Sequence, residues 1–64
     1  MTYEEAFDYM RSLSSLDEEK IREVLKEHSQ TSGSEYILKD EDSNTSFQIR
    51  YTDKDGFIID ALFS

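Results

Sequence analysis

Few side chains in this sequence are suited to catalysis. His28 is the only histidine, and its ordinary pKa near neutral pH makes it the one candidate general base. The chain has no cysteine, no serine in a nucleophile motif, and no phosphate-binding loop at its only glycines, Gly33 and Gly56. His28 also falls on the apolar side of an expected helix, near its carboxyl end, where a structural role is sufficient. We therefore expect neither enzyme activity nor a cofactor.

Acidic side chains recur every four residues in the second quarter of the chain. Glu19, Glu23 and Glu27, called the acidic row below, would lie on one helix face, each about 6 Å further along the axis. Like charges at this spacing destabilise a helix by about 0.2–0.5 kcal/mol per pair, so helix stability does not explain them. One interpretation is a row of carboxylates that resembles nucleic-acid phosphates and binds a basic protein. The alternative is a solvated face that Arg22 and Lys26 neutralise.

A second acidic segment, residues 40–44, is called the acidic loop below and contains Asp40, Glu41 and Asp42. Its alternating oxygen donors match the start of an EF-hand calcium loop. The match then fails, because Thr45 stands where that loop requires glycine and Tyr51 where it requires glutamate. We therefore expect no metal site. The segment instead predicts an exposed loop that belongs to a partner-binding surface.

The first half of the sequence predicts two helices that would position the acidic row. Thr2 and Glu5 have the spacing of a capping box, and Ser15 and Glu18 repeat it before a second helix over residues 16–28. The short connection between the helices predicts an antiparallel hairpin. The apolar stripes are Tyr3, Ala6, Phe7, Met10 and Leu13 in the first helix and Ile21, Val24, Leu25 and His28 in the second.

The second half of the sequence alternates apolar and polar residues, which predicts three strands. The first covers residues 36–39, the second contains Phe47, Ile49 and Tyr51, and the third covers residues 57–63. Between the last two, residues 53–56 predict a tight turn closed by Gly56 in the left-handed region. The predicted fold is a single α+β domain over residues 1–64, an N-terminal antiparallel helical hairpin packed on a three-stranded antiparallel β-meander (ααβββ).

The third predicted strand has apolar residues on both faces. One face, carrying Phe57, Ile59, Ala61 and Phe63, would pack against the helices. The other face carries Ile58 and Leu62, which together with Ile37 form an outer trio without an internal partner. This trio predicts association through the outer face or the edge of the sheet. The alternative is scattered surface apolar side chains, which are common.

Fifteen acidic and seven basic side chains give a net charge of −8, which disfavours direct binding to nucleic acid or to anionic membranes. The excess is spread evenly, because residues 1–29 carry eight acidic and four basic side chains and residues 30–64 carry seven and three, so each part is at −4. No apolar run has transmembrane length, and the lack of cysteine fits a cytoplasmic protein.

Two functions fit these features. The first is a small acidic protein-binding module, a regulator or inhibitor of phage type, that occupies a basic, nucleic-acid-binding surface of a partner protein and acts as a nucleic-acid mimic. Its predicted surface consists of Glu19, Glu23, Glu27, Asp40, Glu41 and Asp42. The second is a structural or assembly protein that forms a homodimer, or docks on a larger complex, through Ile37, Ile58 and Leu62.

Overall fold

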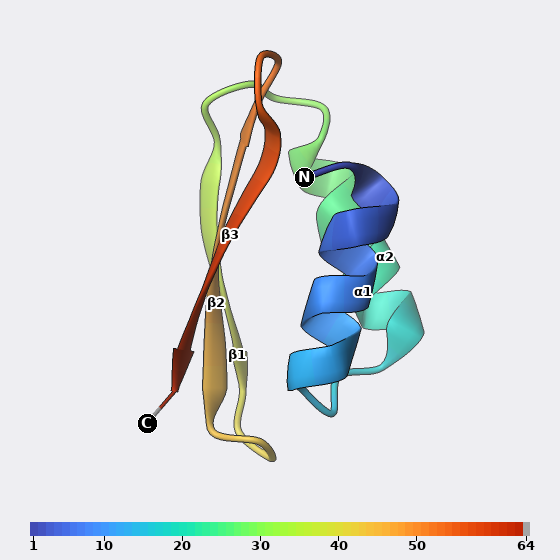
Figure 1. Cartoon of the computed structure of the whole chain (residues 1–64), viewed down its shortest axis with the longest axis vertical. Helices are drawn as coiled ribbons and strands as arrows, with labels where there is room; N and C mark the ends of the chain where they lie inside the picture. The colour runs from blue at the N-terminus through green and yellow to red at the C-terminus, as the bar shows by residue number, and fades with distance from the viewer. Residues whose placement is uncertain (64) are drawn as a thin grey trace.

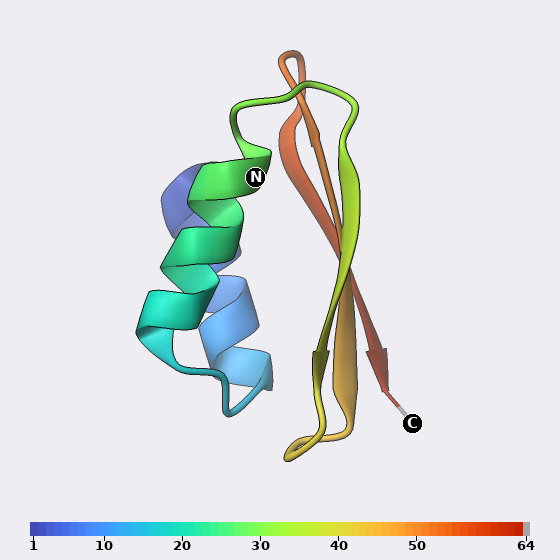
Figure 2. The same ribbon diagram turned by 180° about the vertical axis from the view of Figure 1, so that it is seen from behind.

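The computed structural model of the chain describes residues 1–63. The element order is α1 (Tyr3–Leu13), α2 (Glu18–His28), β1 (Glu35–Asp40), β2 (Thr45–Thr52) and β3 (Gly56–Phe63). The strands form an antiparallel sheet in the order β1-β2-β3. Figure 1 and Figure 2 show the two helices running in opposite directions over the same face of this sheet. The predicted α+β fold, a helical hairpin on a β-meander, is confirmed.

Helix α1 has the predicted cap, and its predicted apolar stripe packs on the core except at Tyr3, which is exposed. The Glu5 backbone N–H donates to Thr2 Oγ1 (3.2 Å), and the Thr2 backbone N–H donates to Glu5 Oε1 (2.9 Å), which completes the capping box. Ala6 and Met10 are fully buried against the sheet and α2. The cap supplies partners for backbone groups that the first helical turn leaves free, and the stripe supplies the apolar contacts that hold the helix in place.

Helix α2 begins later than predicted and has a different cap. Its N-cap is Asp17, whose Oδ1 accepts the Glu19 backbone N–H (3.2 Å). The predicted Ser15–Glu18 capping box is therefore wrong. Ser15 is engaged elsewhere, because its backbone N–H (2.7 Å) and its hydroxyl (3.0 Å) both donate to Asp40 Oδ2. Both Ser15 and Asp17 are suitable cap residues, and the contact with Asp40 decides between them.

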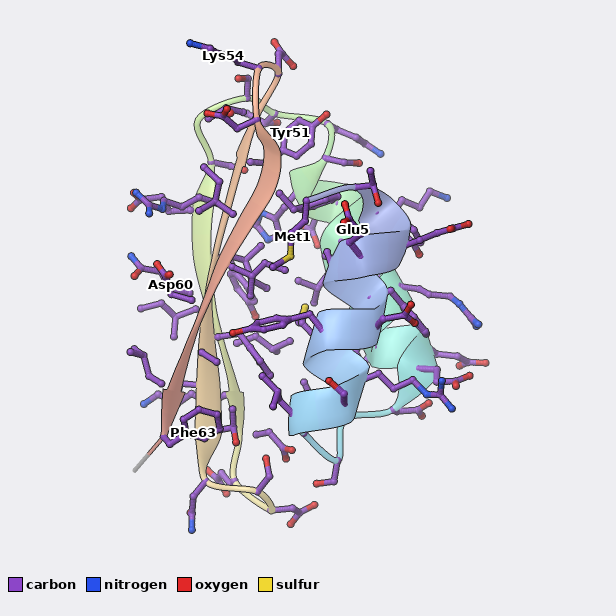
Figure 3. All side chains as sticks on the ribbon, in the orientation of Figure 1. Met1, Glu5, Tyr51, Lys54, Asp60 and Phe63 are labelled. Carbon is purple, nitrogen blue, oxygen red and sulfur yellow. The ribbon has the colours of Figure 1, made fainter. Side chains whose placement is uncertain are left out.

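The core lies between the helical layer, formed by α1 and α2, and the inner face of the sheet. On that face, Phe47 of the central strand β2 pairs with Leu38 of β1 and Ala61 of β3, and its ring meets Tyr9 of α1 edge to face at 6.4 Å. Figure 3 shows Tyr51 on the same, helix-facing side. The buried apolar residues are Ala6, Met10, Ile21, Val24, Leu25, Leu38, Phe47, Ile49, Phe57 and Ile59.

The β2–β3 turn is fixed by Gly56 and by the start of the chain. Gly56 has φ +72°, so the predicted left-handed glycine is confirmed. The backbone of Met1 pairs with the outer edge of β3, because its nitrogen donates to the Phe57 carbonyl (2.7 Å) and its carbonyl accepts the Phe57 N–H (2.9 Å). A Cβ on Gly56 would lie 2.6 Å from the Met1 carbonyl oxygen. Position 56 thus requires glycine both for its backbone conformation and for this close approach.

The helices cover the start of β3 but not its end. Phe57 contacts Tyr3 of α1, with ring centroids 6.5 Å apart, whereas Phe63 at the other end is 66% exposed. Phe63 faces the predicted side of the sheet, but the expectation that it packs against the helices is wrong. Strands twist relative to one another, and β3 runs away from the helical layer toward its end (Figure 1).

Candidate acidic interaction surface

The acidic row lies on the exposed side of α2. Ile21, Val24 and Leu25 of this helix are buried, and all three glutamates of the row are exposed on the remaining surface. The ion pairs among residues 1–63 join Arg11 to Glu18, Arg22 to Glu18 and Arg50 to Asp60. The row contributes to none of them. Its three carboxylates therefore face solvent without a counter-charge held in contact.

Arg22 contacts Glu18 and Phe7 and forms no ion pair with the acidic row. Its Nη2 lies 3.7 Å from Glu18 Oε2, one turn earlier on the same helix, and its guanidinium carbon lies 5.2 Å from the centre of the Phe7 ring. The other oxygen of Glu18 lies 3.2 Å from Arg11 Nε. These contacts join α1 to α2 through a cation–π interaction and a shared carboxylate. The alternative in which Arg22 neutralises Glu19 is not what the structure shows.

A shallow groove runs beside part of the row. Glu19 and Glu23 line it together with Tyr3 of α1, which is 41% exposed, and with Arg22, Lys26 and Ser29 of the α2 side. The groove offers an aromatic ring and two carboxylates to a cationic group, but its own two basic side chains balance those carboxylates. Glu27 lies outside the groove, so the row extends past this balanced region toward the end of α2.

Asp40 is part of the structure's interior and not of its exposed surface. It is 6% exposed, and its Oδ2 accepts hydrogen bonds from the Ser15 backbone (2.7 Å), the Ser15 hydroxyl (3.0 Å) and the Ser43 hydroxyl (2.7 Å). Its Oδ1 accepts the Asp42 backbone N–H (3.2 Å). The Ser43 hydroxyl, and after it the Ser15 N–H, lowers the pKa of Asp40 because both donate to the charged carboxylate. The prediction that Asp40 is exposed for a partner is wrong.

The role of Asp40 is to hold the acidic loop against the helical layer. Its bonds to Ser15 join the α1–α2 connection to the turn between β1 and β2. Figure 1 and Figure 2 show these two connections at the same end of the molecule. Glu41 and Asp42 remain exposed on the turn. They thus lie at the end of the molecule where α2 and the acidic row begin, whereas Glu27 lies near the other end.

His28 packs between the end of α2 and the sheet. It is half-buried at the end of α2, and its ring stacks on Tyr36 of β1, with ring centroids 4.8 Å apart and planes 25° from parallel. Its predicted place on the inner stripe is confirmed. Within residues 1–63, no three side chains of His, Cys, Asp or Glu are arranged so that they could hold a metal ion. The stacking contact ties the end of α2 to the sheet.

The outer trio does not form a continuous apolar patch within one molecule. Across the strands, Gln48 stands opposite Ile37, Arg50 opposite Ile58, and Ser46 opposite Leu62, so the polar residues of β2 separate the apolar ones. Ile37 is 58% and Leu62 56% exposed, and Ile58 is half-buried. These residues lie on the side of the sheet away from the helices, as Asp60 does in Figure 3.

Arg50 and Asp60 form the one ion pair of this outer face, with Arg50 Nη2 3.7 Å from Asp60 Oδ2. The Arg50 Nε atom is buried and is the one buried side-chain nitrogen or oxygen of the described chain without a hydrogen-bond partner. Arg50 thus lies near the end of the central strand β2, with its hydrogen bonding incomplete.

Comparison with known proteins gives no match to a family model, to a curated protein or to a solved structure. Of the helices in the described chain, none is long and apolar enough to cross a membrane.

Proposed function

We propose that this protein is a small acidic protein-binding module, a regulator or inhibitor of phage type, that occupies a basic, nucleic-acid-binding surface of a partner protein as a nucleic-acid mimic. The observation that carries the proposal is the acidic row, exposed on α2 and without an ion pair among the described residues. The proposal places the protein in the cytoplasm and gives it a protein partner, without direct nucleic-acid binding.

The proposed surface has two parts, the exposed residues of the acidic loop and the acidic row on α2. The β1–β2 turn, which carries Glu41 and Asp42, lies at the end of the molecule where α2 begins (Figure 1), and the acidic row lies along that helix. Asp40 supports this surface from inside by fixing the loop. Arg11 and Arg22 pair with Glu18, and neither forms an ion pair with the acidic row. A basic partner would be attracted by long-range charge and bound by ion pairs that form on contact.

The proposal is tested by neutralising the row and, as a matched control, an equal number of carboxylates elsewhere. One variant carries Glu19→Gln, Glu23→Gln and Glu27→Gln. The control carries Asp8→Asn, Asp53→Asn and Asp55→Asn, which change the net charge by the same amount on exposed positions outside the proposed surface.

Each tagged protein is used to capture proteins from a lysate of the source organism or its host, with washes at low and high salt. We expect the wild type and the control to retain a basic nucleic-acid-binding protein that high salt releases, and the row variant to lose it. Capture that is equal for all three proteins, or that is unchanged by salt, contradicts the proposal.

A second candidate function is structural: association through the sheet, as a homodimer or as docking on a larger complex. It is favoured by the charge of the outer face, where Glu35 and Asp60 balance Lys39 and Arg50 in a molecule of net charge −8. Because Ile58 and Leu62 point to this face, Ile58→Asp or Leu62→Asp should abolish association while circular dichroism shows the fold intact. An oligomeric state and binding unaffected by both changes would exclude this candidate.

A further inference from the structure

The outer face of the sheet is crossed by three rows of side chains. The strand register places residues of β1, β2 and β3 side by side in each row. From the start of β1 to its end, the rows are Glu35–Arg50–Ile58, Ile37–Gln48–Asp60 and Lys39–Ser46–Leu62. Successive rows are two residues apart along the strands, which is roughly 7 Å.

A half-turn about the middle row brings this face opposite a second copy of itself with complementary side chains in contact. The first and last rows exchange places, so that on β1 an acidic residue meets a basic one and on β3 two apolar residues meet. An interface of this kind uses the same surface on both molecules, as the two-fold axis of a homodimer requires.

We propose that two copies of the chain pack outer face to outer face, about a two-fold axis that crosses the strands at the row Ile37–Gln48–Asp60. The inference rests on the second candidate function, association through the sheet, and names the occupant and the register. The partner is a second copy of this chain because the outer face is electrically neutral and self-complementary. The rest of the molecule carries the full charge of −8, so two copies repel each other through any other surface.

The register pairs side chains that are separated within one copy. Ile58 meets Leu62 of the second copy, twice, and Ile37 meets its own equivalent on the axis, which joins the outer trio into apolar contacts that a single copy cannot make. Glu35 meets Lys39 of the second copy, also twice.

Polar groups of β2 and β3 also find partners in this register. Arg50 meets Ser46 of the second copy, whose hydroxyl can accept a hydrogen bond from the exposed part of the guanidinium group. The two Asp60 carboxylates approach each other near the axis, and each is compensated by the Arg50 of its own chain.

The packing needs no change of fold. Both helices cover the opposite face, so no element stands between two outer faces (Figure 1, Figure 2). Sheets pack face to face roughly 10 Å apart with strands about 30° from aligned, which keeps the paired rows in reach. Three strands at roughly 4.8 Å spacing give a small face, below the roughly 800 Å² per partner of a standard interface, so the dimer is expected to be weak.

The test is a charge exchange on β1, measured by sedimentation over protein concentrations up to about 1 mM, the range expected for a small interface. We expect the wild type to dimerise reversibly. Glu35→Lys alone and Lys39→Glu alone should each weaken dimerisation by about three- to tenfold, since each leaves like charges facing across the interface. The double variant should restore it. Because both residues are exposed, none of these changes removes a buried contact of the fold.

Three other outcomes would overturn the inference. A wild type that stays monomeric throughout the range has no such interface. A dimer that Ile58→Asp dissociates but the charge exchange does not affect would associate through the outer face in another register, and the second candidate function would stand. A dimer that only Ala61→Pro dissociates would pair along the free edge of β3. The Phe57 N–H points to this edge, where it donates to Met1, and the Ala61 N–H, four residues later on the same strand, points to the same edge. Proline at position 61 would remove that N–H.

Discussion

Among single residues, Asp40 joins the α1–α2 connection to the β1–β2 turn through its carboxylate. Ser15, Asp42 and Ser43 donate to it, and these bonds favour the ionised form, so the pKa of Asp40 in the folded protein is lowered. A group with a lowered pKa contributes stability above its ordinary pKa, about 3.9 for Asp, and the contribution is lost as pH falls through the folded value. Glu5, whose pKa the Thr2 backbone N–H lowers, acts in the same direction.

We predict that Asp40→Asn lowers the melting temperature at pH 7 and that the difference from the wild type shrinks as the pH falls from about 4, the ordinary pKa of the unfolded carboxyl, through the lower pKa of the folded one. Thermal unfolding from pH 7 to pH 2.5 measures this. Asp42→Asn is the control, because its side chain is exposed and it contributes to the Asp40 site only by its backbone. A difference that stays constant over the whole pH range would show that the charge of Asp40 is not what stabilises the fold.

The role of Asp40 was not predictable from the sequence. The local pattern showed an acidic segment, and such segments are ordinarily exposed. Its main partner, Ser15, is 25 residues away in the chain and is brought to it only by packing of the helices on the sheet. The exposure of Glu41 and Asp42 follows from the local turn alone.

Gly56 permits a second test at this scale. Both glycines have positive φ, +86° at Gly33 and +72° at Gly56, but only at Gly56 would an added Cβ meet another group, the Met1 carbonyl. Gly33→Ala should cost roughly 1–2 kcal/mol of unfolding free energy, the usual cost of the left-handed region. Gly56→Ala should cost clearly more. Urea denaturation of both variants measures the difference, and equal losses would mean that the contact with Met1 does not constrain the turn.

At the scale of the elements, local signals and distant contacts determine different features. The capping box of α1, the apolar stripes of both helices and the alternation in β2 depend on near neighbours, and each was predictable from the sequence. The start of α2 depends on the contact between Ser15 and Asp40, and the exposure of Phe63 depends on how the twisted sheet leaves the helices. Neither has a signal in the local pattern.

The cap of α2 can be tested directly. Asp17→Ala should destabilise the protein by about 1 kcal/mol, the typical cost of losing an N-cap side chain. A double-mutant cycle assigns the roles: Ser15→Ala and Asp40→Asn should be coupled, because they share a hydrogen bond, whereas Asp17→Ala and Asp40→Asn should add. Denaturant unfolding of the single and double variants supplies the free energies. Coupling of Asp17 with Asp40, and additivity for Ser15, would contradict the assignment.

In the whole molecule, the excess negative charge lies on the helical layer and the strand connections, and the outer face of the sheet carries none of it. The helical layer and its connections, residues 1–29, hold a net charge of −4, the outer sheet face is neutral, and the acidic loop with the β2–β3 turn holds the remaining −4. The position of the acidic row on an exposed helix face was predictable from its spacing. That the row is left without ion pairs was not, because it depends on Arg22 binding Glu18 and Phe7 across the helical layer.

This separation gives the two proposed interactions a different dependence on salt. Binding of a basic partner to the helical side should weaken as salt screens the attraction between unlike charges. Association of two copies through the neutral face should weaken less, because salt screens both the Glu35–Lys39 pairs and the repulsion between two molecules of net charge −8. The acidic helical layers would then face outward on both sides of a dimer and could engage a partner with two equivalent basic surfaces.

The central claim is that the acidic row and loop take the place of a nucleic acid on a basic partner. The most direct measurement is to load the immobilised protein with lysate at low salt and to elute it with increasing concentrations of a DNA duplex, at constant ionic strength. We expect the duplex to displace a basic protein, and the row variant to retain none of that protein. A captured protein that no concentration of nucleic acid displaces would contradict the proposed function, since its bound surface would not be the one that nucleic acid uses.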